Sequence, residues 1–140
     1  MKTLAFGKLT GKHIYVYVSS STLAPSNEDW DEYVKFLKQN FTGGCTTKFI
    51  VYTRSPPPNA VQRKKVADVT RPLGRLLHVS LLTDSNLARG VVTALSWVGG
   101  NYTAFAPDQL DQALKALVVE GFDAVEVRGM VRSFKQQLDA

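Results

Sequence analysis

Alternating apolar and polar residues at the start of the chain predict two short strands, Thr3–Lys8 and Lys12–Ser19. Ile14, Val16 and Val18 occupy every second position of the second segment, which is the period of a strand with two different faces. The short stretch between the two segments ends in glycine, a residue well suited to a turn. We therefore expect the chain to begin with a β-hairpin.

The next segment carries apolar residues at the spacing of an amphipathic helix. Ser26 is the predicted N-cap of this helix, and Asp29, three residues later, completes the pattern of a capping box. Gly43 and Gly44 are expected to end the helix. The side chains that should face the core are Trp30, Tyr33, Val34, Leu37 and Phe41.

Apolar strands and amphipathic helices alternate through the rest of the chain. The predicted strands are Thr47–Thr53, Leu76–Leu82 and Tyr102–Phe105. Prolines, glycines and capping residues bound the helices between and after them, which we predict over residues 59–71, 87–98 and 107–121. In the first of these helices, Val66 and Val69 are expected to face the core, and Arg63, Lys64 and Lys65 to face outward.

A last helix is predicted to run from Asp123 to Leu138, with Glu126 completing a second capping box at its start. Its apolar stripe consists of Val127, Val131, Phe134 and Leu138. This stripe must be covered, either by the same domain, which is the simpler expectation, or by another protein. In the second case the C-terminal helix would be an assembly element and would make the protein a homo-oligomer.

The elements follow one another in the order β-β-α-β-α-β-α-β-α-α, which predicts an α/β domain. Strands separated by single helices become parallel neighbours through right-handed crossovers, and the opening hairpin adds an antiparallel strand. We therefore predict a mixed sheet of four to five strands with an N-terminal β-hairpin, βα crossovers and an extra C-terminal helix. A chain of 140 residues has the size of one domain. Its core should span residues 3 to 119, and its C-terminal helix residues 123 to 139.

Positive charge is concentrated in the middle of the chain, whose formal net charge is +5. Between Lys35 and Arg75, nine lysine and arginine residues stand against one acid, Asp68. Such a block attracts an acidic protein surface, a phosphate-bearing ligand or nucleic acid, or it is only a solvated helix face. Nucleic acid is disfavoured, because no nucleic-acid-binding motif and no interleaved aromatic residues accompany the block.

The sequence also indicates the cellular compartment of the protein. No apolar run approaches the roughly 18 residues that a membrane-spanning helix requires. Lys8 interrupts the first residues before a long apolar stretch can form, so we do not expect a secretory signal. Cys45 is the single cysteine, which excludes an intramolecular disulfide and favours a reducing compartment. We expect a cytoplasmic protein.

Recognisable catalytic and metal-binding patterns are missing from the sequence. His13, His78 and Cys45 are its only soft metal ligands, and no carboxylate stands at ligand spacing from them. No serine occurs in a G-x-S-x-G turn. The three prolines at 56–58 lack the backbone N–H donors that a phosphate-binding loop needs. We therefore expect neither metal nor cofactor, and a protein that is not an enzyme.

The order of these elements and several short stretches resemble the STAS domain, the fold of anti-sigma-factor antagonists and of SpoIIAA-like proteins. The resemblance extends from about Leu4 to Leu117. Trp30–Gln39 is similar to the family's first helix, and Lys48–Thr53 to its central strand. Leu81–Trp97 resembles the family's strand-turn-helix, and Phe105–Leu114 its closing segment. The resemblance implies a regulatory or adaptor domain that binds a partner protein.

The segment that carries the regulatory switch in this family differs in this chain. In phosphoregulated members, an Asp-Ser-Ser-Gly stretch follows the central strand, and a kinase phosphorylates its serine. Here the corresponding residues are Pro58–Val61, which include neither serine nor glycine, and the nearest hydroxyls are those of Thr53 and Ser55. The resemblance therefore does not carry the phosphorylation switch over to this chain.

We expect a basic partner-binding surface where the loop after residue 53 meets two helix N-termini. Its candidate residues are Arg54, Ser55, Asn59, Arg63, Lys64, Ser85 and Arg89. The amides of residues 84–86, with Arg89 one turn later, could hold an anion or form a plain N-cap. Two alternatives stay open: binding of a small ligand such as a nucleotide or lipid headgroup, and self-assembly through the last helix.

Overall fold

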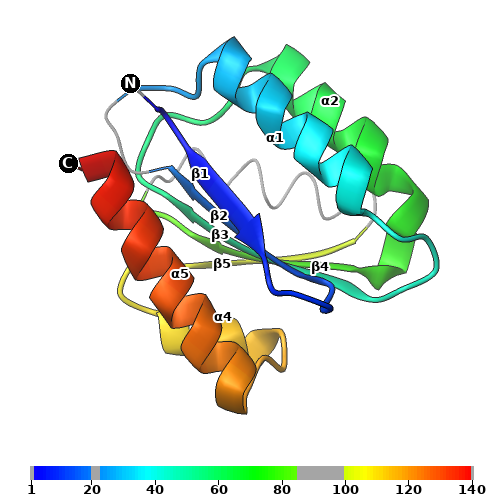
Figure 1. The fold of residues 1–140 in the computed structure, drawn as a ribbon, viewed down its shortest axis with the longest axis vertical. Helices are drawn as coiled ribbons and strands as arrows, with labels where there is room; N and C mark the ends of the chain where they lie inside the picture. The colour runs from blue at the N-terminus through cyan, green and yellow to red at the C-terminus, as the bar shows by residue number, and fades with distance from the viewer. Residues whose placement is uncertain (1, 20–22, 85–99, 140) are drawn as a thin grey trace.

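The computed structural model of the protein describes residues 2–19, 23–84 and 100–139 and shows a five-stranded mixed sheet (Figure 1). The strands are β1 (Ala5–Lys8), β2 (Ile14–Ser19), β3 (Thr47–Thr53), β4 (Leu77–Leu82) and β5 (Asn101–Phe105). They lie in sequence order across the sheet, with β1 antiparallel to β2 and the other neighbours parallel. The predicted mixed sheet and its opening hairpin are therefore confirmed.

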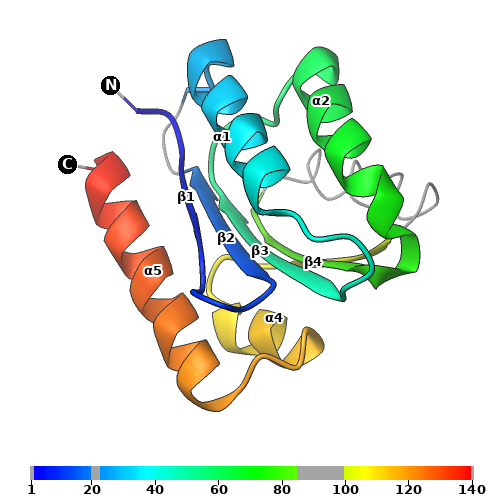
Figure 2. The same ribbon diagram turned by 45° about the vertical axis from the view of Figure 1, so that its right-hand side comes forward.

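Helices cover both faces of this sheet (Figure 2). The helices α1 (Asn27–Asn40) and α2 (Ala60–Thr70) lie side by side on one face. The short α4 (Leu110–Ala116) and the long α5 (Gly121–Asp139) lie on the other. A 3₁₀ segment, Arg71–Leu76, leads from α2 into β4. The sheet is thus the middle layer of three, and β2 is buried on both faces.

The apolar stripe of α5 packs on the sheet of its own domain. Val127 and Val131 are buried in the core that this helix forms with Val16 and Ile50. Gly7 of β1 allows the close approach, because a Cβ atom at this position would lie 2.8 Å from Cε of Met130. The expectation that the C-terminal helix packs on its own domain is confirmed.

The opposite face of the sheet holds an aromatic core. Tyr15 stacks on Phe49 with the ring centroids 4.9 Å apart, and Tyr17 lies 5.0 Å from Tyr33 of α1. Burial raises the pKa of Tyr15, Tyr17 and Tyr33 above its ordinary value, so all three phenols stay neutral at physiological pH. We read these tyrosines as packing residues that fix α1 against the strands.

The start of α1 differs from the predicted capping box. Ser26 is the N-cap, as predicted, and accepts a hydrogen bond of 3.1 Å from the backbone N–H of Asp29. The Asp29 carboxylate, however, accepts from the backbone N–H and the hydroxyl of Thr3, both at 2.7 Å. The Thr3 hydroxyl accepts in turn from the N–H of Ser26. Thr3, from a distant part of the chain, therefore accepts the hydrogen bond from the N-cap backbone N–H, which is the role predicted for Asp29.

The boundaries of the last two helices also differ from the prediction. The predicted helix 107–121 is shorter, because α4 ends in a Schellman motif with Val118 in the left-handed region at φ 55°. The motif's two bonds run from the N–H of Val119 to the Leu114 carbonyl and from the N–H of Val118 to the Lys115 carbonyl. Helix α5 already begins at Gly121, so Asp123 lies in its first turn and is not its N-cap.

The helix predicted over residues 87–98 lies outside the described residues. In the described ranges, no helix is both long enough and apolar enough to cross a membrane.

Candidate functional site

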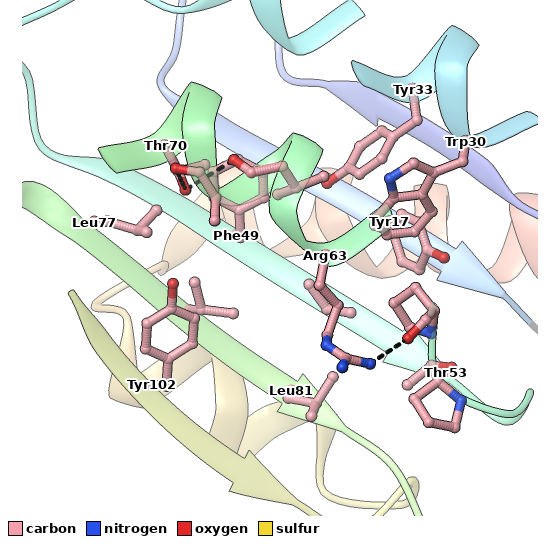
Figure 3. A pocket seen from close by; sticks show the side chains of 16 residues that line it. Tyr17, Trp30, Tyr33, Phe49, Thr53, Arg63, Thr70, Leu77, Leu81 and Tyr102 are labelled. Carbon is pink, nitrogen blue, oxygen red and sulfur yellow. Dashed lines mark hydrogen bonds between the residues drawn. The ribbon is translucent and has the colours of Figure 1, made fainter. Parts of the chain in front are cut away.

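A cavity of about 200 Å³ lies on the α2 side of the sheet, above β3, β4 and β5 (Figure 3). Its floor follows from the strand period of two, since alternate residues of a strand share one face. Strand β3 contributes Phe49, Val51 and Thr53, β4 contributes Leu77, Val79 and Leu81, and β5 contributes Tyr102. Trp30 and Tyr33 of α1 close one end. The walls of the cavity are therefore largely aliphatic and aromatic.

Among the described residues that line this cavity, Arg63 is the one with a charged side chain. Its side chain is half-buried, and its Nη1 donates a hydrogen bond of 2.6 Å to the carbonyl oxygen of Pro58. Figure 3 shows the guanidinium between the ends of β3 and β4, near Thr53 and Leu81. The prediction that Arg63 faces outward is therefore wrong. The reason is helical spacing, because Arg63 shares the inner face of α2 with Val66, Ala67 and Thr70.

Lys64 and Lys65 point outward, as predicted, and both form ion pairs. Lys64 lies 2.9 Å from Asp68, which also pairs with Arg71, and Lys65 reaches Asp31 of α1 at 2.8 Å. The hydrogen bond from Lys64, and then the charges of Lys64 and Arg71, hold the pKa of Asp68 below its usual value. Part of the basic block seen in the sequence is thus neutralised on the surface of α2 itself.

The remaining candidate residues of the loop after β3 divide into one exposed cation and two structural side chains. Arg54 is exposed and has no ion pair within residues 2–19, 23–84 and 100–139. Ser55 is only 3% exposed and belongs to a cluster of three hydroxyls, with Ser19 at 2.9 Å and Thr53 at 3.3 Å. Its hydroxyl is therefore turned away from the surface that we expected it to form.

Asn59 has a structural role at the start of α2. It is the N-cap and accepts a hydrogen bond of 2.8 Å from the N–H of Gln62, whose side chain accepts one of 3.0 Å from the N–H of Asn59. This capping box fixes the first turn of the helix and so the position of Arg63. The two other candidates, Ser85 and Arg89, lie outside the described residues.

Among the described lining residues, the polar groups of the cavity other than Arg63 are uncharged. The Trp30 indole N–H already donates a hydrogen bond of 2.8 Å to the Gln62 carbonyl. Burial raises the pKa of Tyr102, which keeps this phenol protonated. The described lining residues include no histidine, cysteine or carboxylate, and no group of three such ligands that could hold a metal occurs in the described parts of the chain. Within the described lining, the cavity therefore combines an apolar surface with one cation, Arg63.

The architecture agrees with that of a known structure. No protein-family model matches the chain, and no curated protein is significantly similar to it in sequence. It is similar to the crystal structure of an uncharacterized protein of the DUF3478 family, described as having a SpoIIAA-like fold, from Shewanella loihica PV-4. The TM-score is 0.57 at 13% identity, over 81% of this chain and 95% of the other. The chain thus has the STAS/SpoIIAA-like fold that the order of its elements indicated.

Proposed function

We propose that this chain is a non-enzymatic, cytoplasmic binding domain whose cavity above β3–β5 takes a small, mostly apolar molecule. The observation that supports this proposal is the composition of the cavity, whose described lining combines aromatic and aliphatic walls with one guanidinium. Ligand sites have this character in general: apolar lining provides affinity, and a few placed polar groups provide orientation. Arg63 would be the orienting group.

The position of Arg63 favours a ligand with an anionic group. The Pro58 carbonyl takes one of its five N–H donors, and no carboxylate of the described chain lies within ion-pair distance of it. A partly buried guanidinium without a counter-ion gains most from a carboxylate or phosphate, which it binds with paired hydrogen bonds. A volume of about 200 Å³ further favours a compact ligand.

Binding of 2-naphthoate, an aromatic carboxylate, tests this proposal by isothermal titration calorimetry. We expect the wild-type protein to prefer 2-naphthoate over the neutral 2-methylnaphthalene. Replacement of Arg63 by methionine should weaken binding of the carboxylate by roughly ten- to a hundredfold, because a charge-assisted hydrogen bond is lost. The neutral compound should bind both proteins alike.

Two further variants locate the binding. Lys64→Met removes a charge from the adjacent, exposed position and should leave the affinity for 2-naphthoate unchanged. Ala67→Phe places a ring in the cavity and should abolish binding of both compounds, with circular dichroism confirming the fold. If Arg63→Met and Lys64→Met reduce the affinity equally, binding occurs through general charge, and the cavity is not the site.

A regulatory contact with a partner protein is the second candidate function, and Arg54 is the residue that favours it. Its exposed side chain follows β3, next to the prolines at 57 and 58 that line the cavity. A partner with an acidic surface could bind there and respond to a ligand in the cavity. Ser55 and Asn59 would support this surface from within, through their hydrogen bonds, without contacting the partner.

The partner contact is tested by cross-linking and co-purification of the tagged protein. We expect a specific protein to be captured by the wild type and lost with Arg54→Glu. Arg75→Glu is the matched control, because Arg75 is also exposed but lies before β4, at the other end of the sheet. Equal capture by both variants would contradict a contact at Arg54.

A further inference from the structure

Tyr33 brings a phenol into the wall of the cavity above β3–β5, and its hydroxyl has no hydrogen-bond partner among the described residues. The residue is only 5% exposed. Burial, followed by the nearby Tyr17 and Tyr15, raises the pKa of Tyr33, so the phenol stays protonated and can donate a hydrogen bond. A buried hydroxyl without a partner is unfavourable, because it has given up water and gained no bond in return.

Packing explains the ring of Tyr33 but not its hydroxyl. The ring centroid lies 5.3 Å from that of Phe6, 5.0 Å from that of Tyr17 and 5.5 Å from that of Trp30. These contacts hold the ring from several sides, and a phenylalanine could form all of them. The oxygen is therefore the part of Tyr33 that the described parts of the chain leave without a role.

Three neighbouring polar groups differ from the Tyr33 hydroxyl. The Trp30 indole N–H already donates to a backbone carbonyl at 2.8 Å, and Tyr17 has a hydrogen bond with the Ser19 side chain. The Tyr15 hydroxyl is also without a partner among the described residues, but it is fully buried, and Tyr15 does not belong to the lining. A molecule in the cavity could therefore reach the hydroxyl of Tyr33 and not that of Tyr15.

The Tyr33 phenol and the Arg63 guanidinium lie at different places in the cavity (Figure 3). The phenol ring reaches from α1 toward α2, whereas the guanidinium extends from α2 toward the ends of β3 and β4. Apolar side chains, among them Val66 and Val79, line the wall as well. A molecule that fills the cavity can thus meet a cation at one point and a neutral donor at another, with apolar contacts elsewhere.

We propose that the ligand of this cavity carries two polar groups on an apolar frame: an anionic group bound by Arg63, and a hydroxyl or carbonyl oxygen that accepts a hydrogen bond from Tyr33. This inference rests on the proposed function and narrows its ligand to compact anions with a second oxygen remote from the anionic group. Tyr33 is then a specificity-determining residue, because it favours the oxygenated ligand over the same frame without that oxygen.

Hydroxylated 2-naphthoates test the second contact by isothermal titration calorimetry. The compounds carry one hydroxyl group at each free position of the ring that lacks the carboxylate. At least one of them should bind the wild-type protein about three- to tenfold more tightly than 2-naphthoate, which is the range that one hydrogen bond between neutral groups supplies. Tyr33→Phe should remove this gain and leave the affinity for 2-naphthoate itself unchanged.

Matched variants locate this gain in affinity. Tyr15→Phe removes a buried phenol that does not line the cavity, so it should keep the gain. Tyr102→Phe removes the phenol that β5 contributes to the lining, and it should also keep the gain. Because the Tyr33 hydroxyl has no partner among the described residues, Tyr33→Phe should not lower the thermal midpoint of the free protein.

The inference fails, and the proposed function stands, if 2-naphthoate binds through Arg63 but no hydroxylated compound gains affinity. It also fails if the gain survives Tyr33→Phe or is lost with Tyr102→Phe, because the added hydroxyl then contacts another group. A lower thermal midpoint of Tyr33→Phe would show that the phenol oxygen serves the fold instead. If 2-naphthoate does not bind, or binds independently of Arg63, the proposed function fails and this inference fails with it.

Discussion

Replacing Val131 with aspartate is expected to lower the free energy of unfolding by about 4 kcal/mol or more, enough to unfold a domain of ordinary stability. Val131 is 4% exposed and lies in the core between α5 and the sheet, with Val16 and Ile50. The side chains of this core are apolar, so burying a carboxylate among them is costly. Removal of the valine also takes away its packing against the sheet.

Urea denaturation followed by circular dichroism measures this effect. Val131→Thr keeps the shape of the side chain and adds only a hydroxyl, so it should cost about 1–3 kcal/mol. The exposed Phe122→Ser, on the same helix, should cost less than about 0.5 kcal/mol. A stable Val131→Asp protein with a normal transition would mean that α5 does not pack on the sheet as described. The deficit should also shrink at low pH, where the aspartate is protonated.

The pattern of apolar residues predicted the elements that contribute most to the core. The strands at 14–19, 47–53 and 77–82 agree with expectation because they are short, largely buried apolar runs, and the helix from Asn27 to Asn40 agrees because its buried residues recur at helical spacing. The order of the strands followed from the single helices between them. The fold could therefore be predicted from local information and general rules of connection.

The cavity could have been predicted in part. Phe49, Val51 and Thr53 alternate along β3, and Arg63 shares a helical face with Val66 and Ala67. Both patterns are visible in the sequence, but the positive charge of Arg63 suggested the surface. The sequence does not show which group each of these side chains forms a hydrogen bond with. The Pro58 carbonyl that holds Arg63 and the Ser19 hydroxyl that meets Ser55 come from folded geometry.

Ends of elements were predicted less well, because long-range contacts decide them. Val118 ends α4 in a backbone conformation that a β-branched residue rarely adopts, so glycine was the natural expectation. The buried Leu117 and Val119 on either side anchor the chain to the core and hold Val118 in place. In the same way, Thr3 completes the cap of α1 across a long separation in sequence.

The second large loss of stability is expected for Asp29→Ala, because the Asp29 carboxylate belongs to this cap. Asp29 is 5% exposed, and its carboxylate accepts both hydrogen bonds from Thr3. Alanine would leave the Thr3 N–H and hydroxyl buried without this acceptor and would remove a negative charge from the first turn of α1. We expect a loss of about 2–4 kcal/mol of stability at neutral pH, measured by urea denaturation.

The pH dependence of this loss separates Asp29 from an ordinary surface acid. Burial alone would raise the pKa of Asp29, but hydrogen bonds from Thr3 and Ser26 and the charge of Lys2 lower it overall. A carboxyl whose pKa is lower in the folded than in the unfolded state stabilises the fold above the unfolded value of about 3.9, and this contribution disappears as pH falls through the folded value. The difference between wild type and Asp29→Ala should therefore be constant near neutral pH and decrease below about pH 4.

Asp31→Ala provides the matched control for this titration. Asp31 is on the same helix, but it is exposed and pairs with Lys65 on the surface, so its loss should cost less than about 1 kcal/mol. If the two variants lose equal stability, or if the deficit of Asp29→Ala grows as the pH falls, the Thr3–Asp29 contact does not hold the start of α1. A large deficit that fades in acid would instead show that residues before β1 cap the helix that borders the cavity through Trp30 and Tyr33.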